Sequence, residues 1–401
     1  MIKSGYYFPM TDETWMETEL AQLRAQGLER QLQVMPDSGG VFMLEGERVL
    51  NFSSNDYLGL ARAPAVIEAA AAALRRWGAG ATASRLVVGT LPCHAELETR
   101  LAQFKGYAAA LVFGSGYLAN AGAVSALVGR HDRVLADKLA HASLLDGATL
   151  SRAVIHRFQH NDVDHLVRLL RQKPASARDR IMTESVFSID GDLAPLRDIA
   201  RVAQEHGAML LVDEAHASGV WGPGGTGLIS EWRLQQAVSV AMGTLSKALG
   251  AYGGFIAGSE TLKRWLVNRA RPFIFSTGLP PPCVGAVLGV LDVLEKNHRL
   301  GADLLCRADV FRKRLQAAGF NTGGSVSQIV PVIIGDNQKT LALARRLRSH
   351  GILAAAIRPP TVPAGTARLR LSVTLLHTPE DLDRAADILA TTAREEGGIL
   401  S

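Results

Sequence analysis

The sequence predicts an α/β protein in which a mostly parallel central sheet forms a three-layer sandwich and a smaller α+β domain follows. From about residue 50 to 290, short apolar runs alternate with helical patterns. Strands separated by helices of this length form parallel sheets that are covered on both faces. After Pro280-Pro281-Pro282 the strands become fewer. We therefore predict an N-terminal helical segment at 1–50, a large domain at 51–290 and a small C-terminal domain at 291–401.

Each predicted element follows from the spacing of its apolar residues. A pattern rich in Glu, Gln, Leu and Arg predicts an amphipathic helix at 13–33. Apolar runs in the large domain predict strands at 109–113, 133–136, 181–183, 209–213, 238–242 and 254–257. Helical patterns between them predict helices at 118–128, 144–151, 163–171 and 195–206. After Pro280-Pro281-Pro282 we expect helices at 283–297, 300–318, 338–350 and 379–396, with strands at 328–334 and 368–373.

The last predicted strand alternates cleanly. Leu369 and Leu371 point to one side of the strand, and Arg368 and Arg370 point to the other. An arginine on such a strand most simply faces water, so we expect at least one of the two on a solvated face.

Composition narrows the class of protein. The 401 residues are 47% hydrophobic and 20% charged, which is typical of a soluble globular chain and excludes a disordered or fibrous one. The net charge of +5 is mild, and the absence of a long basic run disfavours nucleic-acid binding. A weak positive field would suit a polyanionic substrate such as a coenzyme A thioester or an acidic carrier protein, although ordinary surface variation explains it equally well.

Cysteine usage and the distribution of apolar residues bear on location. Cys93, Cys283 and Cys306 are far apart and show no CxxC spacing, which disfavours a disulfide framework or a zinc site and favours a reducing compartment. The N-terminus lacks the pattern of a signal peptide, and no apolar stretch nears the ~18 residues of a membrane span. We expect a cytoplasmic protein that binds neither membrane, nucleic acid nor metal.

The segment Thr244 to Gly250 carries the strongest chemical signal. It places a single lysine, Lys247, between hydroxyl groups and a glycine-rich stretch, directly after an apolar run. A lysine that forms an imine must shed its charge, and nearby hydroxyls and backbone amides can hold a phosphate. The alternative is a solvated loop lysine, which this segment alone does not exclude.

A second polar cluster follows the apolar run at 209–213, which ends in Asp213 and is followed by His216. Ligand groups in open α/β sheets sit at the carboxyl ends of strands. Asp213 could accept the proton of a cationic ring nitrogen there, with His216 beside the ring's substituent. The alternatives are a helix N-cap and a solvated loop residue. With Lys247 on the adjacent predicted strand, the pair matches pyridoxal phosphate, because the lysine forms the imine and the acid keeps the pyridine nitrogen protonated.

Two further turns fit the same cofactor. Ser115, Gly116 and Tyr117 join a strand to a helix, and the first amides of a helix form a ready phosphate site. His141 follows the strand predicted at 133–136 and could stack flat on the cofactor ring. Taken alone, each feature is also explained by a plain turn or a structural histidine.

Together these segments resemble the α-oxoamine synthases, a family of fold-type I pyridoxal phosphate enzymes. The resemblance covers about residues 50–390. It rests jointly on Asn51 to Leu60, Ser115 to Tyr117, His141 to Leu144, Phe187 to Asp192, Asp213 to His216, Thr244 to Lys247, Ser276-Thr277 and Ile357 to Pro363. It implies the fold of that superfamily and a homodimer with shared active sites.

The resemblance implies a role for each matching residue. Lys247 would form the imine and, once displaced by substrate, remove the α-proton; Asp213 would pair with the ring nitrogen; and His141 would stack on the ring. Further cofactor contacts would come from Ser115, Gly116, Tyr117, Glu184, Ser188, His216, Thr244 and, in the neighbouring subunit's site, Thr277. Substrate contacts would come from Asn55, His141, Arg358, Thr361 and an N-terminal arginine, for which Arg30 is favoured over Arg24.

The resemblance also implies a reaction. The segment Arg358 to Pro363 is most similar to a subfamily that condenses L-alanine with a pimeloyl thioester and releases CO2. The thioester carrier, coenzyme A or a carrier protein, stays open. A relative that uses glycine with an acetyl or succinyl thioester also stays open, because one methyl group changes pocket affinity by only about 1–3 kcal/mol. A non-catalytic homologue is disfavoured, because Lys247 and its helpers are all present.

Overall fold

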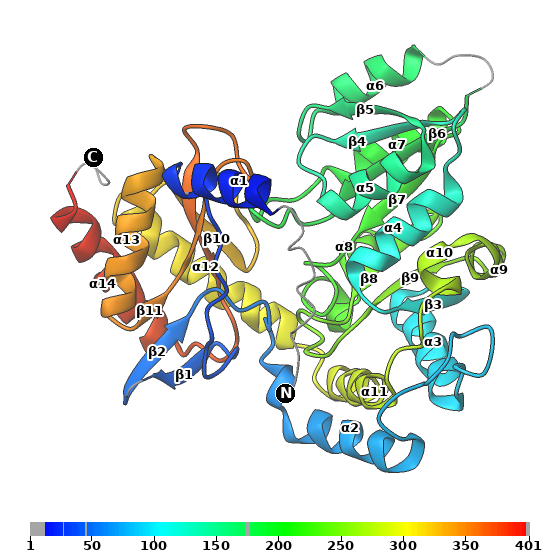
Figure 1. The fold of residues 1–401 in the computed structure, drawn as a ribbon, viewed down its shortest axis with the longest axis horizontal. Coiled ribbons are helices and arrows are strands. Elements are labelled where there is room, and N and C mark those ends of the chain that lie inside the picture. Colours follow the sequence, from blue (N-terminus) through cyan, green and yellow to red (C-terminus); the bar gives the residue numbers. More distant parts are fainter. Residues whose placement is uncertain (1–12, 27, 45, 173–176, 398–401) are drawn as a thin grey trace, which may run out of the picture. The chain divides into compact units, whose positions relative to one another are not determined.

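The computed structural model describes residues 13–26, 28–44, 46–172 and 177–397 (Figure 1). The chain divides into two compact units, 1–37 and 38–401, which are described separately. The boundaries that the sequence predicts at residues 50 and 290 stay a prediction.

In the first unit, helix α1 (Thr14–Ala25) is shorter than the helix predicted at 13–33. The amides of Leu28 and Glu29 turn back to the carbonyl oxygen of Leu23, at 2.8 and 3.2 Å. Such back-bonding caps the C-terminus of a helix. The predicted length was therefore wrong, because the polar pattern continues beyond the point where the backbone turns.

Seven strands form the main sheet of the second unit, in the order β3-β9-β8-β7-β6-β4-β5 (Figure 1). They are β3 (Ala109–Phe113), β4 (Arg133–Asp137), β5 (Val154–Phe158), β6 (Asp179–Glu184), β7 (Met209–Asp213), β8 (Val240–Thr244) and β9 (Gly254–Gly258). Strand β9 pairs antiparallel with β3 and β8, and the other pairs are parallel. The predicted mostly parallel central sheet is confirmed.

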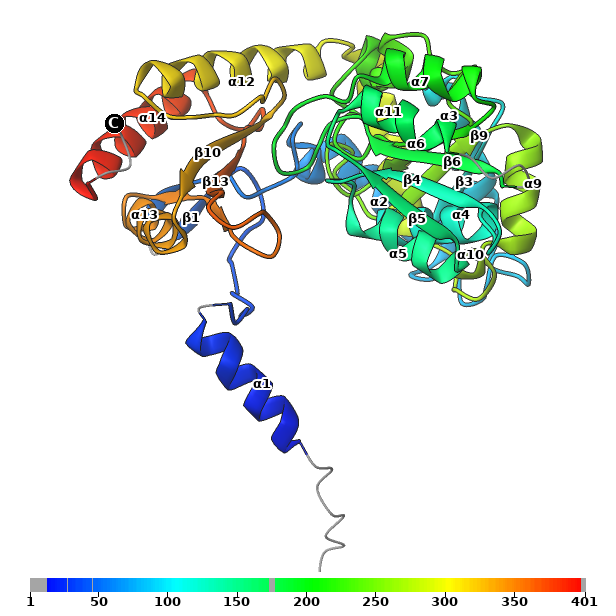
Figure 2. The ribbon, with the colours of Figure 1, turned by 90° about the horizontal axis from the view of Figure 1, so that it is seen from above.

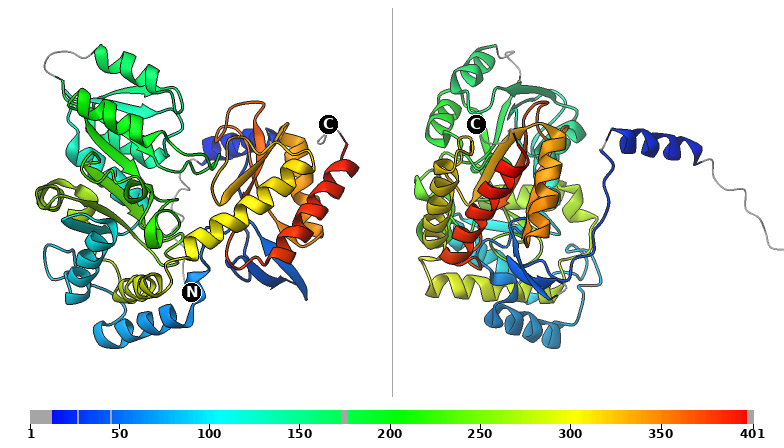
Figure 3. Two further views of the ribbon diagram at one scale, coloured as in Figure 1. Left: turned by 180° about the vertical axis from the view of Figure 1, so that it is seen from behind. Right: turned by 90° about the vertical axis from the view of Figure 1, so that its left-hand side faces the viewer.

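Alternate residues of these strands enter two apolar cores, one on each face of the sheet. Along β3, Leu111 and Phe113 join one core, and Ala110 and Val112 join the other. The first core is covered by α4 (Gly116–Leu127), α5 (Ala142–Ser151) and α9 (Glu260–Arg269). The second is covered by α3 (Pro92–Lys105), α7 (Leu196–Glu205) and α11 (Pro281–Lys296). This is the predicted three-layer sandwich (Figure 3).

Some elements of the main sheet and its helices depart from the sequence patterns. Strand β8 begins two residues later than the run at 238–242, and the patterns do not predict β5 or the helices α2 (Pro64–Trp77), α3 and α9. Strand β5 lies at the edge of the sheet, where its polar His156 and Arg157 interrupt the apolar run. Helix α6 (Val163–Arg171) has the predicted bounds. No helix within the described ranges is long and apolar enough to cross a membrane.

Two small sheets form the rest of the second unit. One has the order β10-β13-β12, from Ile329–Gly335, Ala367–Ser372 and Ala355–Ile357. The other joins β1 (Val41–Leu44) and β2 (Glu47–Asn51) to β11 (Ile352–Leu353). Helices α12 (Leu300–Ala317), α13 (Asn337–Ser349) and α14 (Pro379–Glu395) pack against these strands and one another (Figures 2 and 3). The segment before the main sheet therefore pairs with a strand near the C-terminus, which local patterns do not reveal.

Candidate active site

A cavity of about 210 Å³ opens where β6, β7 and β8 end and α4 and α5 begin. Its walls are formed by Ser115, Gly116, Tyr117, Asn120, His141, Ser143, Glu184, Asp213, Ala215, His216, Met242, Thr244, Ser246 and Lys247. The structure therefore brings together most of the cofactor-site residues that the sequence singles out. They come from five different elements that meet at the carboxyl edge of the sheet.

Lys247 is held by a line of hydrogen bonds. Its Nζ lies 2.8 Å from Nε2 of His216, and Nδ1 of His216 lies 2.7 Å from the hydroxyl of Tyr57. Tyr57 donates its proton to Oδ1 of Asn55 at 3.0 Å, so Nδ1 must carry the proton that His216 donates to Tyr57. Nε2 is then an acceptor, and the amine of Lys247 donates to it. This arrangement fixes both the tautomer of the histidine and the direction of the amine.

The pKa of the lysine amine suits it to nucleophilic and basic chemistry. Burial lowers the pKa of Lys247 to about 8, although the charges of Asp213 and Glu184 act in the opposite direction. Burial, and then the charge of Lys247, lowers the pKa of His216 well below its ordinary value, so its ring is neutral at neutral pH. A part of the Lys247 population is therefore uncharged near neutral pH and can attack a carbonyl group.

Two acidic side chains lie side by side at the same edge. Glu184 and Asp213 are register partners at the ends of β6 and β7, and both are buried. Asp213 accepts hydrogen bonds from Nδ2 of Asn120 at 2.7 Å and from the amide of Ala215 at 2.8 Å. Burial, and then the charge of Asp213, raises the pKa of Glu184 well above its ordinary value. The edge thus offers one hydrogen-bonded carboxylate beside a carboxyl group that favours its protonated form.

The start of α4 forms a seat for an anion. Ser115 caps the helix, since its Oγ accepts a hydrogen bond from the amide of Leu118 at 3.1 Å. A Cβ added to Gly116 would lie 2.9 Å from Met242 Cε and 3.3 Å from Thr244 Oγ1, so this turn lies close against side chains of β8. Gly116 and Tyr117 open the helix, where amides point outward and attract negative charge.

His141 begins α5 at the exposed mouth of the cavity. Its Nδ1 lies 2.7 Å from Oγ of Ser143, which accepts a hydrogen bond from Asn120 Nδ2 at 2.9 Å. Because Asn120 also donates to Asp213, Ser143 and Asn120 connect His141 to the buried carboxylate. Sequence reasoning missed Asn120 and Ser143. The signal for Asn120 is an amide side chain within an otherwise apolar stretch of α4.

A second cavity of about 440 Å³ takes in Ser188 and Thr361, which do not line the first. Its walls are Lys138, Leu139, Ala140, Arg157, His160, Phe187, Ser188, Ile189, Asp190, Asp192, Gly324, Thr361, Val362, Pro363, Thr366 and Arg368. Ala140 in this wall directly precedes His141 of the first cavity in the sequence. His160 lies in this wall. Burial alone would lower its pKa, but hydrogen bonds to Asp137 and Asp192 outweigh burial and raise the pKa to about 10.

Both arginines of β13 are buried, so the predicted solvated face was wrong for each. Arg370 donates to the carbonyl oxygen of Ser188 at 2.6 Å, to Asn55 Oδ1 at 3.2 Å and to the Tyr57 hydroxyl at 3.3 Å. Arg368 forms an ion pair with Asp190. The polar face of the strand is buried because the turn at 187–190 packs against it, which alternation within one strand cannot reveal. Sequence reasoning missed Arg370 and Tyr57 as site residues.

Four predicted substrate or cofactor residues do not line either cavity. Asn55 instead accepts hydrogen bonds from the Tyr57 hydroxyl at 3.0 Å and from Arg370 at 3.2 Å. Thr277 is exposed and forms a backbone bridge with Ser84. Arg358 follows β12, is partly buried, and accepts a hydrogen bond from the amide of Thr361 at 3.0 Å. Arg30 is an exposed residue of the first unit, in which Arg24 pairs with Glu29 at 2.9 Å. The roles of Asn55, Thr277, Arg358 and Arg30 stay predictions.

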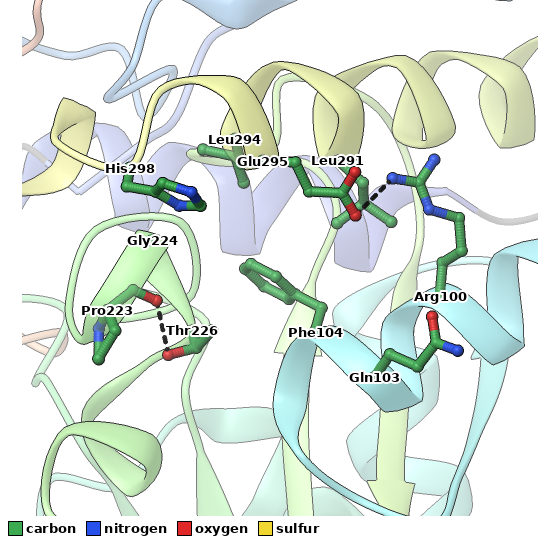
Figure 4. Close-up of a pocket in the computed structure, with 10 residues that line it drawn as sticks. All are labelled: Arg100, Gln103, Phe104, Pro223, Gly224, Thr226, Leu291, Leu294, Glu295 and His298. Atoms are coloured by element: carbon green, nitrogen blue, oxygen red, sulfur yellow. Dashed lines mark hydrogen bonds and ion pairs between the residues drawn. The ribbon is translucent and has the colours of Figure 1, made fainter.

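A third cavity, of about 260 Å³, lies between α3, α11 and the turn η2 (Pro223–Gly225) (Figure 4). Phe104 points into it, and Arg100 lies 3.0 Å from Glu295 at one end. None of the predicted site residues is among its described walls. The candidate chemistry therefore belongs to the first two cavities.

The first cavity fits pyridoxal phosphate by the chemistry of its donors and acceptors. Lys247 offers an amine for the aldehyde, Asp213 offers a buried carboxylate for a cationic ring nitrogen, and the start of α4 offers a seat for the phosphate. Oε1 of Glu184, a residue of the same wall, is buried and has no hydrogen-bond partner among the described residues. With a doubly covered, mostly parallel sheet, these features define a fold-type I pyridoxal phosphate enzyme.

Comparisons with known proteins agree with this class. The model of the class I and II aminotransferase family matches residues 47–389. A Bacillus cereus protein provisionally named 8-amino-7-oxononanoate synthase is 44% identical over 390 residues, which cover 96% of this chain and 99% of that protein. A Geobacillus kaustophilus protein with the same provisional name is 45% identical over 386 residues, with 96% and 99% coverage.

Solved structures show the same fold. Serine palmitoyltransferase from Sphingomonas wittichii matches with a TM-score of 0.91 and 32% identity over 98% of this chain and 100% of that chain. Serine palmitoyltransferase from S. paucimobilis, with bound pyridoxal phosphate and myriocin, matches with a TM-score of 0.90 and 32% identity, covering 97% and 99%. The 8-amino-7-oxononanoate synthase of Francisella tularensis matches with a TM-score of 0.74 and 28% identity, covering 87% and 98%.

The chain belongs to the class I and II aminotransferase family and, within it, to the α-oxoamine synthases, which are pyridoxal phosphate-dependent acyltransferases. The predicted cofactor, pyridoxal phosphate, is confirmed.

Proposed function

We propose that the chain condenses L-alanine with a pimeloyl thioester to give 8-amino-7-oxononanoate, CO2 and a free thiol, a step of biotin synthesis in the cytoplasm. The observation that carries the proposal is the line from Lys247 through His216 and Tyr57 to Asn55 and Arg370. This line connects a lysine of lowered pKa to a buried guanidinium. The names of relatives at 44–45% identity support the choice of substrates.

The amino acid is bound by its carboxylate. Arg370 lies at the far end of the line from Lys247, and a guanidinium is the natural partner of a carboxylate because it offers paired N–H donors. Arg358, which the family resemblance assigns to the carboxylate, would share this contact. The fixed carboxylate determines which bond at Cα faces the cofactor.

Lys247 then removes the proton from Cα. Its Nζ accepts this proton, and His216 Nε2 keeps the amine in place throughout. Bound pyridoxal phosphate supplies an electron-accepting ring that stabilises negative charge at Cα. Asp213 keeps a positive charge on the ring nitrogen, and Asn120 and the amide of Ala215 hold the Asp213 carboxylate in position.

The acyl donor enters from the second cavity. A bond forms between Cα and the thioester carbonyl carbon, the C–S bond breaks, and the thiol leaves with a proton. The carboxylate then leaves as CO2, and Cα takes up one proton from solvent, so the reaction consumes one proton overall. Pimeloyl chains end in a carboxylate, which Lys138 and Arg157 in the cavity wall can attract. Acidic and basic side chains in this wall suit a short dicarboxylic chain better than a long alkyl chain.

We also propose that two copies of the chain assemble around shared sites. Large apolar side chains are exposed next to the bridge between Ser84 and Thr277, including Val87 at 74% and Phe275 at 70%. Exposed apolar clusters of this kind mark interfaces. A second copy would cover them and bring Thr277 to the neighbouring cofactor. Sedimentation of the purified chain should give the mass of a dimer, and a monomer at micromolar concentration would contradict the proposal.

The choice of substrates is tested by mass detection of products. L-Alanine, glycine and L-serine should each be offered with pimeloyl-, acetyl-, succinyl- and palmitoyl-CoA, and with a pimeloyl carrier protein. We expect the highest kcat/KM for L-alanine with a pimeloyl donor, and Arg157→Ala should raise the KM of that donor more than that of acetyl-CoA. Preference for L-serine with palmitoyl-CoA, or for glycine with a short donor, would replace the proposed substrates while leaving the family unchanged.

A further inference from the structure

A buried ion pair lies outside the walls of the cofactor cavity. Lys105, the last residue of α3, places its Nζ 2.5 Å from Oε2 of Glu214, 2.5 Å from the carbonyl oxygen of Thr226 and 3.2 Å from Oγ of Ser218. The side chains of Lys105 and Glu214 are 1% and 0% exposed. All three ammonium donors have acceptors, as a charge taken out of water requires.

Glu214 connects this pair to the site through the backbone. It directly follows Asp213, and its amide donates to the carbonyl oxygen of Met242 on β8 at 2.8 Å. Its own carbonyl oxygen accepts hydrogen bonds from the amides of Ala217 and Ser218, at 3.0 and 2.8 Å. These bonds close the turn that carries His216. A shift of the Glu214 side chain would therefore move the backbone on both sides of it.

The surroundings leave the pair little room to shift. Oε1 of Glu214 accepts a hydrogen bond from the amide of Ile229 at 2.9 Å. Gly227 has a φ of +103°, and a Cβ added there would lie 2.3 Å from Glu214 Oε2 and 2.6 Å from Lys105 Nζ. The backbone is thus pressed onto the pair at a position that needs glycine. Thr226, whose carbonyl oxygen accepts the hydrogen bond from Lys105, also lines the third cavity (Figure 4).

We propose that Lys105 and Glu214 are positioning residues that set where Asp213 and His216 stand around the cofactor. Neither side chain lines the cavity, so the pair acts through the turn between Asp213 and Ser218 rather than by touching a reactant. The proposal rests on the proposed function for its kinetic consequences, whereas its spectroscopic consequences need only bound pyridoxal phosphate.

The test compares Glu214→Gln, Lys105→Met and the double variant with both changes. The double variant removes one positive and one negative charge, so an effect that remains in it comes from geometry and not from net charge. The matched control is Asp179→Asn, which breaks the buried pair of Arg133 and Asp179 (Nε to Oδ1, 2.8 Å). These two residues are the first residues of β4 and β6, at the ends of the strands away from the cofactor cavity. Thermal unfolding, the pH midpoint of the visible cofactor band, kcat and KM are measured for each variant.

If the pair positions the site, both single variants and the double variant shift the midpoint by about half a pH unit or more. In the same variants kcat falls about tenfold to a hundredfold, while the KM of the amino acid changes less. Asp179→Asn lowers thermal stability without moving the midpoint. A wild-type midpoint in a folded double variant would overturn the proposal, as would an equal shift in the control. If the substrates proposed above are wrong, turnover is absent in the wild type as well. The midpoint of the cofactor band then still tests whether Lys105 and Glu214 position the site.

Discussion

The main sheet and the small sheet β10-β13-β12 both bring charged side chains to the site, but they do so in different ways. In the main sheet, Glu184 and Asp213 are the last residues of neighbouring parallel strands and lie in register. In the small sheet, Arg368 and Arg370 lie within β13 and are buried by a turn from a distant part of the chain. Residues at strand ends owe their position to local pattern, whereas residues within β13 owe theirs to tertiary packing.

This difference separates two kinds of role. The strand-end groups of the main sheet surround Lys247 and would act on the cofactor. The arginines of β13 lie beyond the His216–Tyr57 line and would act on the substrates. Substitutions in the first region should therefore alter the spectrum of the bound cofactor, and substitutions in the second should alter KM.

Replacing Lys247 should have the largest effect. Lys247→Ala lacks the amine that we propose bonds the cofactor, so the visible absorbance band should vanish and turnover should fall to background. The matched control is Lys263→Ala, which removes a lysine that pairs with Glu98 outside the cavity. A visible band that persists unchanged in Lys247→Ala would show that another residue holds the cofactor.

The two acidic residues at the sheet edge should respond very differently. Asp213→Asn removes the charge that we propose faces the ring nitrogen, and it should lower kcat by about a thousandfold with the fold intact. Glu184→Gln should cost no more than about tenfold, because burial already raises the pKa of Glu184 and glutamine imitates the protonated acid. The measurement is kcat together with circular dichroism, and equal losses in the two variants would contradict the separate roles.

The two arginines of β13 test the other side of the comparison. Arg370→Ala removes the guanidinium at the end of the Lys247 line and should raise the KM of L-alanine by about a hundredfold. Arg368→Ala breaks the pair with Asp190 in the second cavity and should mainly raise the KM of the acyl donor. Steady-state kinetics with one substrate varied at a time distinguishes them. Identical KM patterns would mean that β13 serves one substrate only.

Much of the fold could be predicted because its pattern is local. The buried strands β3, β7 and β9 carry apolar runs long enough to place them in the sequence. The helices that separate most of the strands indicate a mostly parallel sheet, although they do not reveal that β9 is antiparallel. The predicted end of the helix at 13–33 was wrong because the turn that ends α1 depends on backbone hydrogen bonds to the carbonyl oxygen of Leu23, which the periodic pattern does not reveal. Strand β5 was not predicted because an edge strand can carry polar residues, which interrupt the apolar run.

The candidate site divides in the same manner. Lys247, Asp213 and His216 lie at strand ends or in turns directly after them, so spacing alone points to them. Tyr57 and Arg370 could not be found in this way, because each gains its position from contacts with residues far away in the sequence. His216 lies 159 residues from Tyr57, and Ser188 lies 182 residues from Arg370. A buried network of this kind is defined by the fold and not by any local segment.

The pH dependence of Lys247 is the smallest effect and the most direct test of its surroundings. The pKa of Lys247 is lowered from 10.5 to about 8 by burial, so its amine becomes reactive as pH rises through about 8 and gains little above that value. From pH 7 to pH 9 the uncharged fraction should rise about tenfold, whereas an unperturbed lysine would gain about a hundredfold. Acetylation of the apoprotein with trace anhydride at pH 7 and at pH 9, read by peptide mass spectrometry at Lys247, measures this ratio. In Asp213→Asn the midpoint should move lower still, because the charge of Asp213 raises the pKa of Lys247. A midpoint that rises in this variant would show that Asp213 does not face the amine as the structure places it.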